Sequence, residues 1–383
     1  MKNRNPFKFG GKVEGYQFFD REESCRKLKR RLLDGSSNVV MYAPRRYGKT
    51  SLVAKVLRQL REEDGVNSVL FDLSRIPTLA RFCEEYVNAV YAAVGGTGEL
   101  VHWFLECLGN CNPTVSVNAG VMRIRLDLKN VFSETSIAEV LDLPEKMAQA
   151  NGLEALVVAF DEFQEVAELS KEYSVEKIFR SCIQNHRIVR YVFFGSKQHL
   201  LQRMFGDMAS PFYRSALQMP IGKPPVAESR EFLRTRFADA GLFVDDGVIE
   251  GIVAASDNIP FYLQAYASLI FERMSDSGIG EAKPEFLDEA GEELMQANAA
   301  YFTELLNLLS EAQRLIVEAI ARAPVAQFDE AYRSQHSLPS LSTVHSAVRE
   351  LLKDGLIERD SGVYRLTDPL LARFVLASPA VIY

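Results

Sequence analysis

The sequence lacks several features that would assign its class at once. It has one tryptophan, and no window of about 18 residues is apolar throughout. No membrane-spanning helix is therefore predicted. The first residues are basic but carry no apolar stretch of the kind that a secretory signal contains. These absences favour a cytoplasmic protein that makes no contact with a membrane.

Cysteine and positive charge are also scarce. The five cysteines stand at positions 25, 83, 107, 111 and 182, and no Cys or His pair with zinc-ligand spacing follows Cys107 and Cys111. Free thiols in a reducing compartment are expected. Lys and Arg number 44 against 51 Asp and Glu, which gives a net charge of -7. That balance argues against a protein that coats nucleic acid, although a small basic patch remains compatible with it.

The pattern of apolar runs predicts a parallel α/β sheet. A chain of 383 residues should form two or three domains. Buried strands separated by helical patterns are predicted at 37–43, 68–74, 153–160 and 190–196, with a hairpin within 114–128. After the Pro-Pro pair at 224–225 the pattern is helical only. Beyond residue 298, three helices and two short strands indicate a winged helix-turn-helix. We expect domains at 1–222, 223–297 and 298–383.

One strand runs directly into a loop that can bind phosphate. The pattern G-x-x-x-x-G-K-[ST] is met at seven of eight positions, and the exception is alanine at the first. Backbone N–H groups of such a loop and the following helix N-terminus bind phosphate, the lysine reaches the β- and γ-phosphates, and the threonine hydroxyl can bind Mg²⁺. The loop residues are Ala43, Pro44, Arg45, Arg46, Tyr47, Gly48, Lys49, Thr50 and Ser51. We expect Ala43 to preserve the loop geometry.

Acidic and polar residues follow two further strands. Asp161 directly follows the predicted strand at 153–160 and can hold Mg²⁺, and Glu162 can act as a general base on water. A helix N-cap with an acidic first turn is the competing interpretation. Ser196 could contact the γ-phosphate or the water, or could belong to a plain turn. Arg214 could be an arginine finger acting on its own or on a neighbour's nucleotide, or a solvated surface residue.

Six segments, in this order, resemble the archaeal-type ATPase family, a prokaryotic branch of the STAND ATPases within the AAA+ superclass. They are NPFKFG (5–10), FFDREE (18–23), APRRYGKTSL (43–52), VVAFDEFQEV (157–166), VFFGSKQHLL (192–201) and NIPFYLQAYA (258–267). The resemblance implies a three-layer P-loop NTPase domain with an extra strand between the two motif strands, a helical lid and a winged helix.

The same resemblance implies additional nucleotide contacts. Phe19 and Arg21 would line the adenine and ribose side, and Pro260 would sense the nucleotide state. Relatives usually carry glycine where this chain has Asn258. The implied cofactors are ATP or ADP with Mg²⁺, and the choice of adenine rests on the resemblance because no guanine-reading N-K-x-D motif occurs.

Three hypotheses for function remain open. The first is a slow ATPase switch whose nucleotide state moves the lid and winged helix. The second is a DNA-binding initiator or transposition helper, and the third is a scaffold with structural ADP. Residues 301–383 hold eight Lys and Arg against ten Asp and Glu, so DNA is a weaker expectation than a protein partner. An oligomer is compatible with the sequence.

Overall fold

The protein divides into two compact units. The computed structural model describes residues 4–11, 13, 15–18, 21–35, 37–95, 98–118, 121–126 and 133–377. Arg21–Arg45 and Lys49–Gly222 form a sheet unit, whereas Met1–Asp20, Arg46–Gly48 and Lys223–Tyr383 form a helical unit. The chain between β1 and α2 therefore contributes residues to both units.

The sheet unit is built on five parallel strands. Their order is β2-β5-β6-β1-β7, and their bounds are β1 (Val39–Tyr42), β2 (Asn67–Asp72), β5 (Leu156–Asp161), β6 (Val189–Gly195) and β7 (Leu217–Pro220). Every residue of β5 is buried, as expected for a strand that is covered on both faces. Strand β6 lies between β1 and β5. This is the extra strand that the resemblance implied, and the predicted fold class is confirmed.

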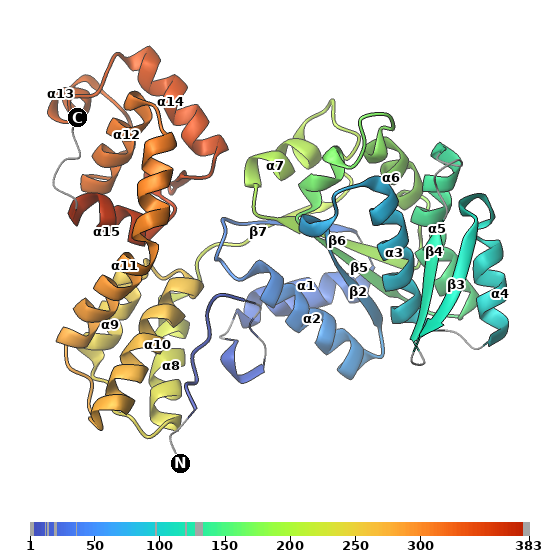
Figure 1. Cartoon of the computed structure of the whole chain (residues 1–383), viewed down its shortest axis with the longest axis horizontal. Helices are drawn as coiled ribbons and strands as arrows, with labels where there is room; N and C mark the ends of the chain where they lie inside the picture. Colours follow the sequence, from blue (N-terminus) through green and yellow to red (C-terminus); the bar gives the residue numbers. More distant parts are fainter. Residues whose placement is uncertain are drawn as a thin grey trace. The chain divides into compact units, whose positions relative to one another are not determined.

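Helices cover both faces of this sheet, which makes three layers (Figure 1). Helices α1 and α2 pack together on one face, and α2 contacts β2 and β5. Helices α3, α5 and α6 pack on the other face, and α7 contacts β1 and β6. Their bounds are α1 (Glu22–Asp34), α2 (Lys49–Asp64), α3 (Leu79–Val94), α5 (Glu134–Ala150), α6 (Val175–Ile183) and α7 (Gln198–Gly206).

An aromatic cluster holds the ends of β5 and β6 in place. The ring of Phe163, which opens the 3-10 helix η4 (Phe163–Glu168), lies 4.4 Å from that of Phe193 and 5.2 Å from that of Phe212. Phe160 and Phe179 stand 5.3 Å apart in the same cluster. All five rings are fully buried, and each contributes about 1.5–3 kcal/mol by burial alone. The residues that follow Asp161 are therefore anchored on a rigid floor.

A two-stranded ribbon is inserted between α3 and α5. It consists of β3 (Pro113–Asn118) and β4 (Val121–Leu126) and follows α4 (Gly98–Glu106). The amide of Asn88 on α3 pairs with the backbone of Ile124, donating to its carbonyl at 2.8 Å and accepting from its N–H at 2.9 Å. The predicted hairpin is thus present, and the Ala119-Gly120 part of its turn lies outside the described residues.

The helical unit contains a bundle and a winged helix. The bundle helices are α8 (Val226–Asp239), α9 (Asp246–Ala255), α10 (Pro260–Ser277) and α11 (Glu285–Leu308). The winged helix contains α12 (Glu311–Arg322), α13 (Glu330–Gln335), α14 (Leu341–Lys353), the antiparallel strands β8 (Ile357–Asp360) and β9 (Val363–Leu366), and α15 (Pro369–Ala377). Helix α11 runs through residue 298, where the third domain is predicted to begin.

Side-chain caps fix several helix starts in this unit. Asp245 accepts a hydrogen bond from the N–H of Val248, and Ser310 and Gln313 form a reciprocal capping box at the start of α12. The N-terminal segment packs on the bundle: the Phe7 ring lies 4.7 Å from that of Phe237, and the Asn5 amide donates to the Ser268 hydroxyl at 2.9 Å.

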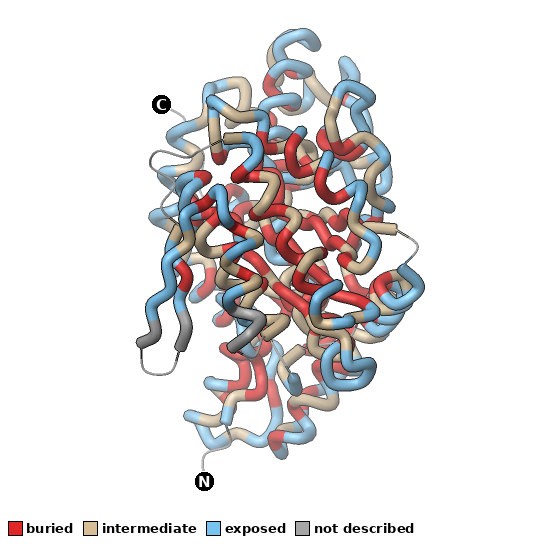
Figure 2. Tube along the Cα trace, turned by 90° about the vertical axis from the view of Figure 1, so that its right-hand side faces the viewer, coloured by how far each residue is buried: buried red, intermediate tan, exposed pale blue. Residues whose placement is uncertain are grey.

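Burial follows the layers of the fold. Figure 2 shows the buried residues along the strands and the inner sides of helices, with exposed residues at outer turns. All five cysteines are free thiols, and only Cys107 is partly exposed. Within the described ranges, no helix has the length and apolar character needed to cross a membrane.

Candidate functional site

The loop between β1 and α2 has the backbone form that a phosphate-binding loop needs. Gly48 has a φ of 78°, a left-handed conformation that favours glycine, and α2 begins at the next residue. Ala43 is 1% exposed and is not among the residues of positive φ. Its Cβ therefore adds no backbone strain, and the missing glycine is explained. Ser51 lies buried in the first turn of α2.

Lys49 turns its side chain back into its own loop. Its Nζ donates to the carbonyl oxygens of Ala43 and Pro44, each at 2.8 Å. Burial lowers the pKa of Lys49 to about 8, although the carboxylates of Glu162 and Asp161 act in the opposite direction. The ammonium group is thus poorly solvated and held by two acceptors that a phosphate oxygen could replace.

Thr50 and Asp161 place two oxygen atoms side by side. The Thr50 hydroxyl donates to Oδ2 of Asp161 at 2.6 Å, and the other carboxylate oxygen accepts from the N–H of Glu162 at 2.9 Å. Burial raises the pKa of Asp161 to about 6. A hydroxyl and a buried carboxylate are hard oxygen ligands of the type that Mg²⁺ prefers, so this pair fits the ion.

Glu162 is tied down through one oxygen. Its Oε2 accepts from the N–H and the hydroxyl of Ser196, both at 3.0 Å, and from Nε2 of Gln164 at 2.6 Å. Burial acts to raise the pKa of Glu162, but these hydrogen bonds and the charge of Lys49 outweigh it and lower the pKa. Glu162 adopts a left-handed backbone with φ of 50° and stands at the N-cap position of the 3-10 helix η4, where its side chain forms no capping hydrogen bond.

Two predicted arginines of the sheet unit have different surroundings. Arg21 is 6% exposed, donates to the carbonyl of Gly222 at 2.6 Å, and its charge acts to lower the pKa of Lys49. Arg214 is exposed, and its guanidinium lies 5.1 Å from the centre of the Tyr213 ring. In the described part of the chain no hydrogen bond or ion pair joins Arg214 to Lys49 or Glu162. Arg45 reaches Ser196, with 3.5 Å between Nε and the hydroxyl oxygen.

Three more predicted residues belong to the helical unit. Arg46 forms an ion pair with Asp368, and its guanidinium lies 5.0 Å from the ring centres of Phe261 and Tyr262. Tyr47 is 3% exposed and donates to Oε1 of Glu358 at 3.2 Å. Pro260 is the first residue of α10. Within this unit, Arg46 and Tyr47 thus contact both the bundle and the winged helix.

Asn258 has a backbone conformation that suits glycine. Its φ is 54°, a conformation that glycine adopts freely and asparagine tolerates better than most residues. Its Nδ2 also donates to the carbonyl of Pro224 at 2.7 Å, a bond that glycine could not form. Phe19, the remaining predicted contact, lies outside the described residues.

Gln164 was not assigned a role from the sequence. It stands in the segment VVAFDEFQEV. The feature of the sequence that could have indicated a role is a polar amide close to the apolar residues Phe163 and Val166. In the structure it is 3% exposed and contacts the Glu162 carboxylate. The left-handed conformation of Glu162, which the sequence pattern does not reveal, brings the two side chains together.

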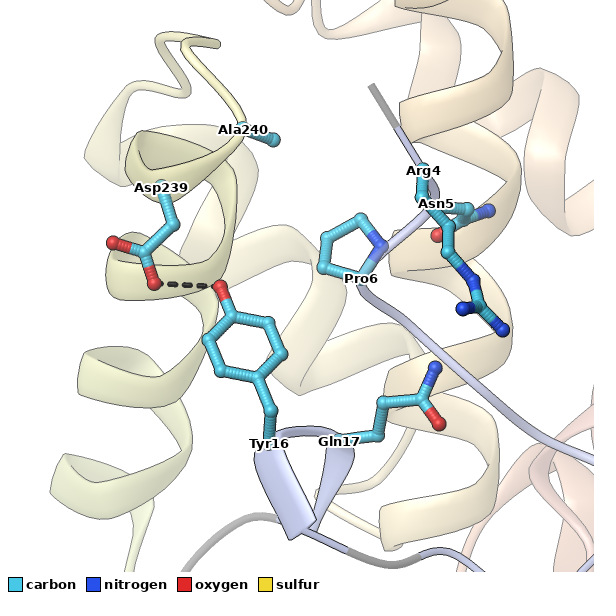
Figure 3. Close-up of a pocket in the computed structure, with 7 residues that line it drawn as sticks. All are labelled: Arg4, Asn5, Pro6, Tyr16, Gln17, Asp239 and Ala240. Atoms are coloured by element: carbon cyan, nitrogen blue, oxygen red, sulfur yellow. Dashed lines mark hydrogen bonds between the residues drawn. The ribbon is translucent and has the colours of Figure 1, made fainter. Parts of the chain in front are cut away.

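A separate cavity of about 450 Å³ lies within the helical unit. Figure 3 shows its lining, where the Tyr16 hydroxyl donates to Oδ2 of Asp239 at 2.5 Å. The residues around it are Arg4, Asn5, Pro6, Tyr16, Gln17, Asp239 and Ala240. None of the predicted nucleotide contacts that the structure describes lines this cavity.

The winged helix presents a mixed surface on α14. His345, Arg349 and Lys353 are exposed, and Lys353 pairs with Glu350 at 3.5 Å between Nζ and Oε2. Val344, Val348 and Leu351 are buried and form the core side of this helix. The exposed face therefore carries few cations that could contact phosphates.

Known proteins resemble the chain in fold. Residues 300–377 match a family described as "Probable winged helix domain". A Walker-type ATPase of Pyrococcus abyssi is 20% identical, with a TM-score of 0.67 over 97% of this chain and 99% of that chain. The ORC2 protein of Aeropyrum pernix, in ADPNP–ADP complexes, is 15% identical over 93% and 94%, with a TM-score of 0.48. No curated protein sequence matches.

A third solved structure is the ORC1 protein of Aeropyrum pernix in complex with DNA. It is 16% identical, with a TM-score of 0.48 over 94% of this chain and 92% of that chain. The likeness to the Pyrococcus abyssi protein shows that the chain has the fold of a Walker-type ATPase over nearly its whole length, and the family match identifies a winged helix domain at residues 300–377. At these identities they show the fold alone.

Proposed function

We propose that the protein binds ATP with Mg²⁺ and hydrolyses it slowly, as a switch of the STAND type. The observation that carries this proposal is the gathering of Lys49, Thr50, Asp161, Glu162 and Ser196 at the carboxyl ends of β1, β5 and β6 and the start of α2. Open parallel sheets bind ligands at this edge. These residue types, in these places, suit phosphoryl transfer to water.

Each residue has a separate role in this proposal. The Lys49 ammonium exchanges its two loop carbonyls for oxygens of the β- and γ-phosphates, which it neutralises. Thr50 and Asp161 would hold Mg²⁺, which would supply further charge neutralisation. Glu162 accepts a proton from the attacking water, and Ser196 binds either the terminal phosphate or that water.

Contacts within the helical unit support a switch in which the loop communicates with the other domains. Arg46 and Tyr47 belong to the phosphate-binding loop by sequence, yet their side chains contact α10, β8 and the residue before α15. A ligand that changes the loop backbone must therefore change these contacts. We propose that ATP and ADP differ in this effect, and that Pro260 at the start of α10 responds to it.

We further propose that the winged helix binds a protein rather than DNA. Its formal charge is negative, and Glu350 within α14 and Asp354 directly after it lie beside the cations of this helix. The alternative is duplex binding, which would weaken steeply with salt and with Arg349→Ala and Lys353→Ala. Absence of duplex binding at low salt would exclude that alternative.

The test of the proposed activity is a phosphate-release assay on purified protein. We expect slow, Mg²⁺-dependent turnover that Glu162→Gln lowers by about 10²–10⁴-fold while leaving MgATP binding intact. Lys49→Ala should weaken binding itself. If ATP binds without turnover and ADP is carried through purification, the protein is a scaffold with structural ADP and the enzymatic half of the proposal is wrong.

A further inference from the structure

Gln164 is a buried polar residue in surroundings that otherwise suit apolar side chains. It is 3% exposed and sits in η4 between the buried residues Phe163 and Val166. Burying an amide is unfavourable unless its hydrogen bonds are satisfied. A residue of this type at this place therefore has to be explained by what its amide contacts.

The contacts of the amide fix its orientation. Nε2 donates to Oε2 of Glu162 at 2.6 Å and lies 3.3 Å from Oε1 of Glu165. Since both partners are carboxylates, the NH₂ end must face them. The other end, Oε1, is buried and has no hydrogen-bond partner among the described residues. An amide that served only to fill the core would gain nothing from this arrangement, because the unpaired acceptor is destabilising.

Gly195 at the end of β6 leaves the space that the amide occupies. A Cβ at this position would lie 2.1 Å from Oε1 of Gln164 and 3.2 Å from Oε2 of Glu162. Gly195 is not among the residues of positive φ, so no conformational freedom is needed there. Its lack of a side chain is explained by the close approach of the other two residues.

The remaining geometry leaves one oxygen of Glu162 available. Three donors converge on Oε2: the N–H and hydroxyl of Ser196 and the amide of Gln164. No hydrogen bond to Oε1 of Glu162 is found within the described ranges. We propose that Gln164, in the space left by Gly195, is a positioning residue that holds Oε2 so that Oε1 faces the attacking water. This inference rests on the proposed ATPase activity.

Ser196 and Gln164 divide this task. Ser196 is also the residue proposed to contact the terminal phosphate or the water, so its hydroxyl can be recruited away from Glu162 when ATP binds. Gln164 has no such second role, and its amide faces only carboxylates. It can therefore keep Glu162 in place throughout the reaction.

The decisive variant is Gln164→Met, which keeps the length of the side chain and removes the donor. We expect kcat to fall about tenfold, the loss equivalent to one charge-assisted hydrogen bond, while the Kd for MgATP changes less than twofold. In the Glu162→Gln background the same change should have no further effect on the residual rate. A merely structural role would lower stability and binding together and would not depend on Glu162.

Gly195→Ala provides an independent test of the same geometry. The added Cβ should displace the Gln164 amide and lower kcat by a similar factor. In a Gln164→Ala background the amide is absent from the space beside Gly195, so Gly195→Ala should lower kcat little further. Additive losses in this cycle would contradict the assignment.

The outcomes separate this inference from the proposed function. Wild-type turnover that is lost in Glu162→Gln but kept in Gln164→Met overturns the role of Gln164 and leaves the ATPase standing. Absence of turnover in the wild type overturns both. If Gln164→Met melts well below the wild type, the inference is tested with Gly195→Ala in the presence and absence of Gln164→Ala. Additive losses of kcat in that cycle reject the inference.

Discussion

The hydroxyl of Thr50 lies 2.6 Å from Oδ2 of Asp161, a residue 111 positions further along the chain. This hydrogen bond joins the first turn of α2 to the end of β5. It also means that the two residues predicted to bind Mg²⁺ from separate motifs are adjacent in space before any ligand is considered.

The first prediction concerns this pair. Thr50→Val removes the hydroxyl while keeping the shape of the side chain. The buried Asp161 carboxylate then loses a hydrogen-bond donor, and Mg²⁺ loses one of its proposed ligands. We expect the Mg²⁺ concentration needed for half-maximal turnover to rise about tenfold or more. Thr50→Ser retains the hydroxyl and is the matched control, which should stay near the wild type. Equal behaviour of the two variants would contradict the role of the hydroxyl.

Lys49 gives a prediction about pH and stability. Its pKa of about 8 lies below the ordinary lysine value of 10.5, so between these pH values the unfolded chain binds more protons than the folded protein. The free energy of unfolding therefore rises with pH in this window, by up to about 3 kcal/mol from this group. Urea unfolding of the ligand-free protein should show this rise in the wild type.

Lys49→Met supplies the control for that titration. The variant buries no ammonium, so it should be more stable than the wild type below pH 8, and the difference should shrink as the pH approaches 10. Other groups titrate in both proteins and cancel in the comparison. A difference in stability that is constant over pH 7–10 would show that the ammonium is better solvated than the structure indicates.

Ala43→Gly tests whether the loop needs its usual glycine. Because Ala43 has no positive φ, glycine would add only freedom to the unfolded chain. We expect a loss of about 0.4–1 kcal/mol in the free energy of unfolding and an unchanged affinity for MgATP. Tighter nucleotide binding by the glycine variant would mean that the loop has to adopt a backbone conformation absent here.

A double-mutant cycle can measure the Arg46–Asp368 ion pair. The Asp368 side chain is only 14% exposed, and burial raises its pKa although Arg46 acts to lower it. Removing either partner leaves the other in a poorly solvated place, so the coupling between Arg46→Ala and Asp368→Ala should be about 1 kcal/mol or more. Measuring the cycle with and without ATP also tests the proposed switch, which requires the coupling to change.

Strongly apolar elements and strands that flank a clear turn could be predicted from the sequence, whereas some weakly apolar elements could not. Strand β5 is a continuous apolar run and was predicted within a few residues, but β7 has one buried residue in four and ends in proline, so its pattern is not that of a buried strand. Helix α15, which begins at Pro369, was also not predicted. The contacts of Arg46 with Asp368, and of Gln164 with Glu162, depend on backbone turns and distant packing that periodicity does not encode.

The backbone at Ala43 has a consequence for how such proteins are recognised. A sequence pattern that requires glycine at the first position of the loop assumes that this residue needs a positive φ. In this chain only Arg46 and Gly48 adopt positive φ in the loop. Genome-wide searches with the strict pattern would therefore pass over chains of this kind. A search that accepts any small residue there, and requires a buried strand ending in Asp-Glu downstream, would recover them.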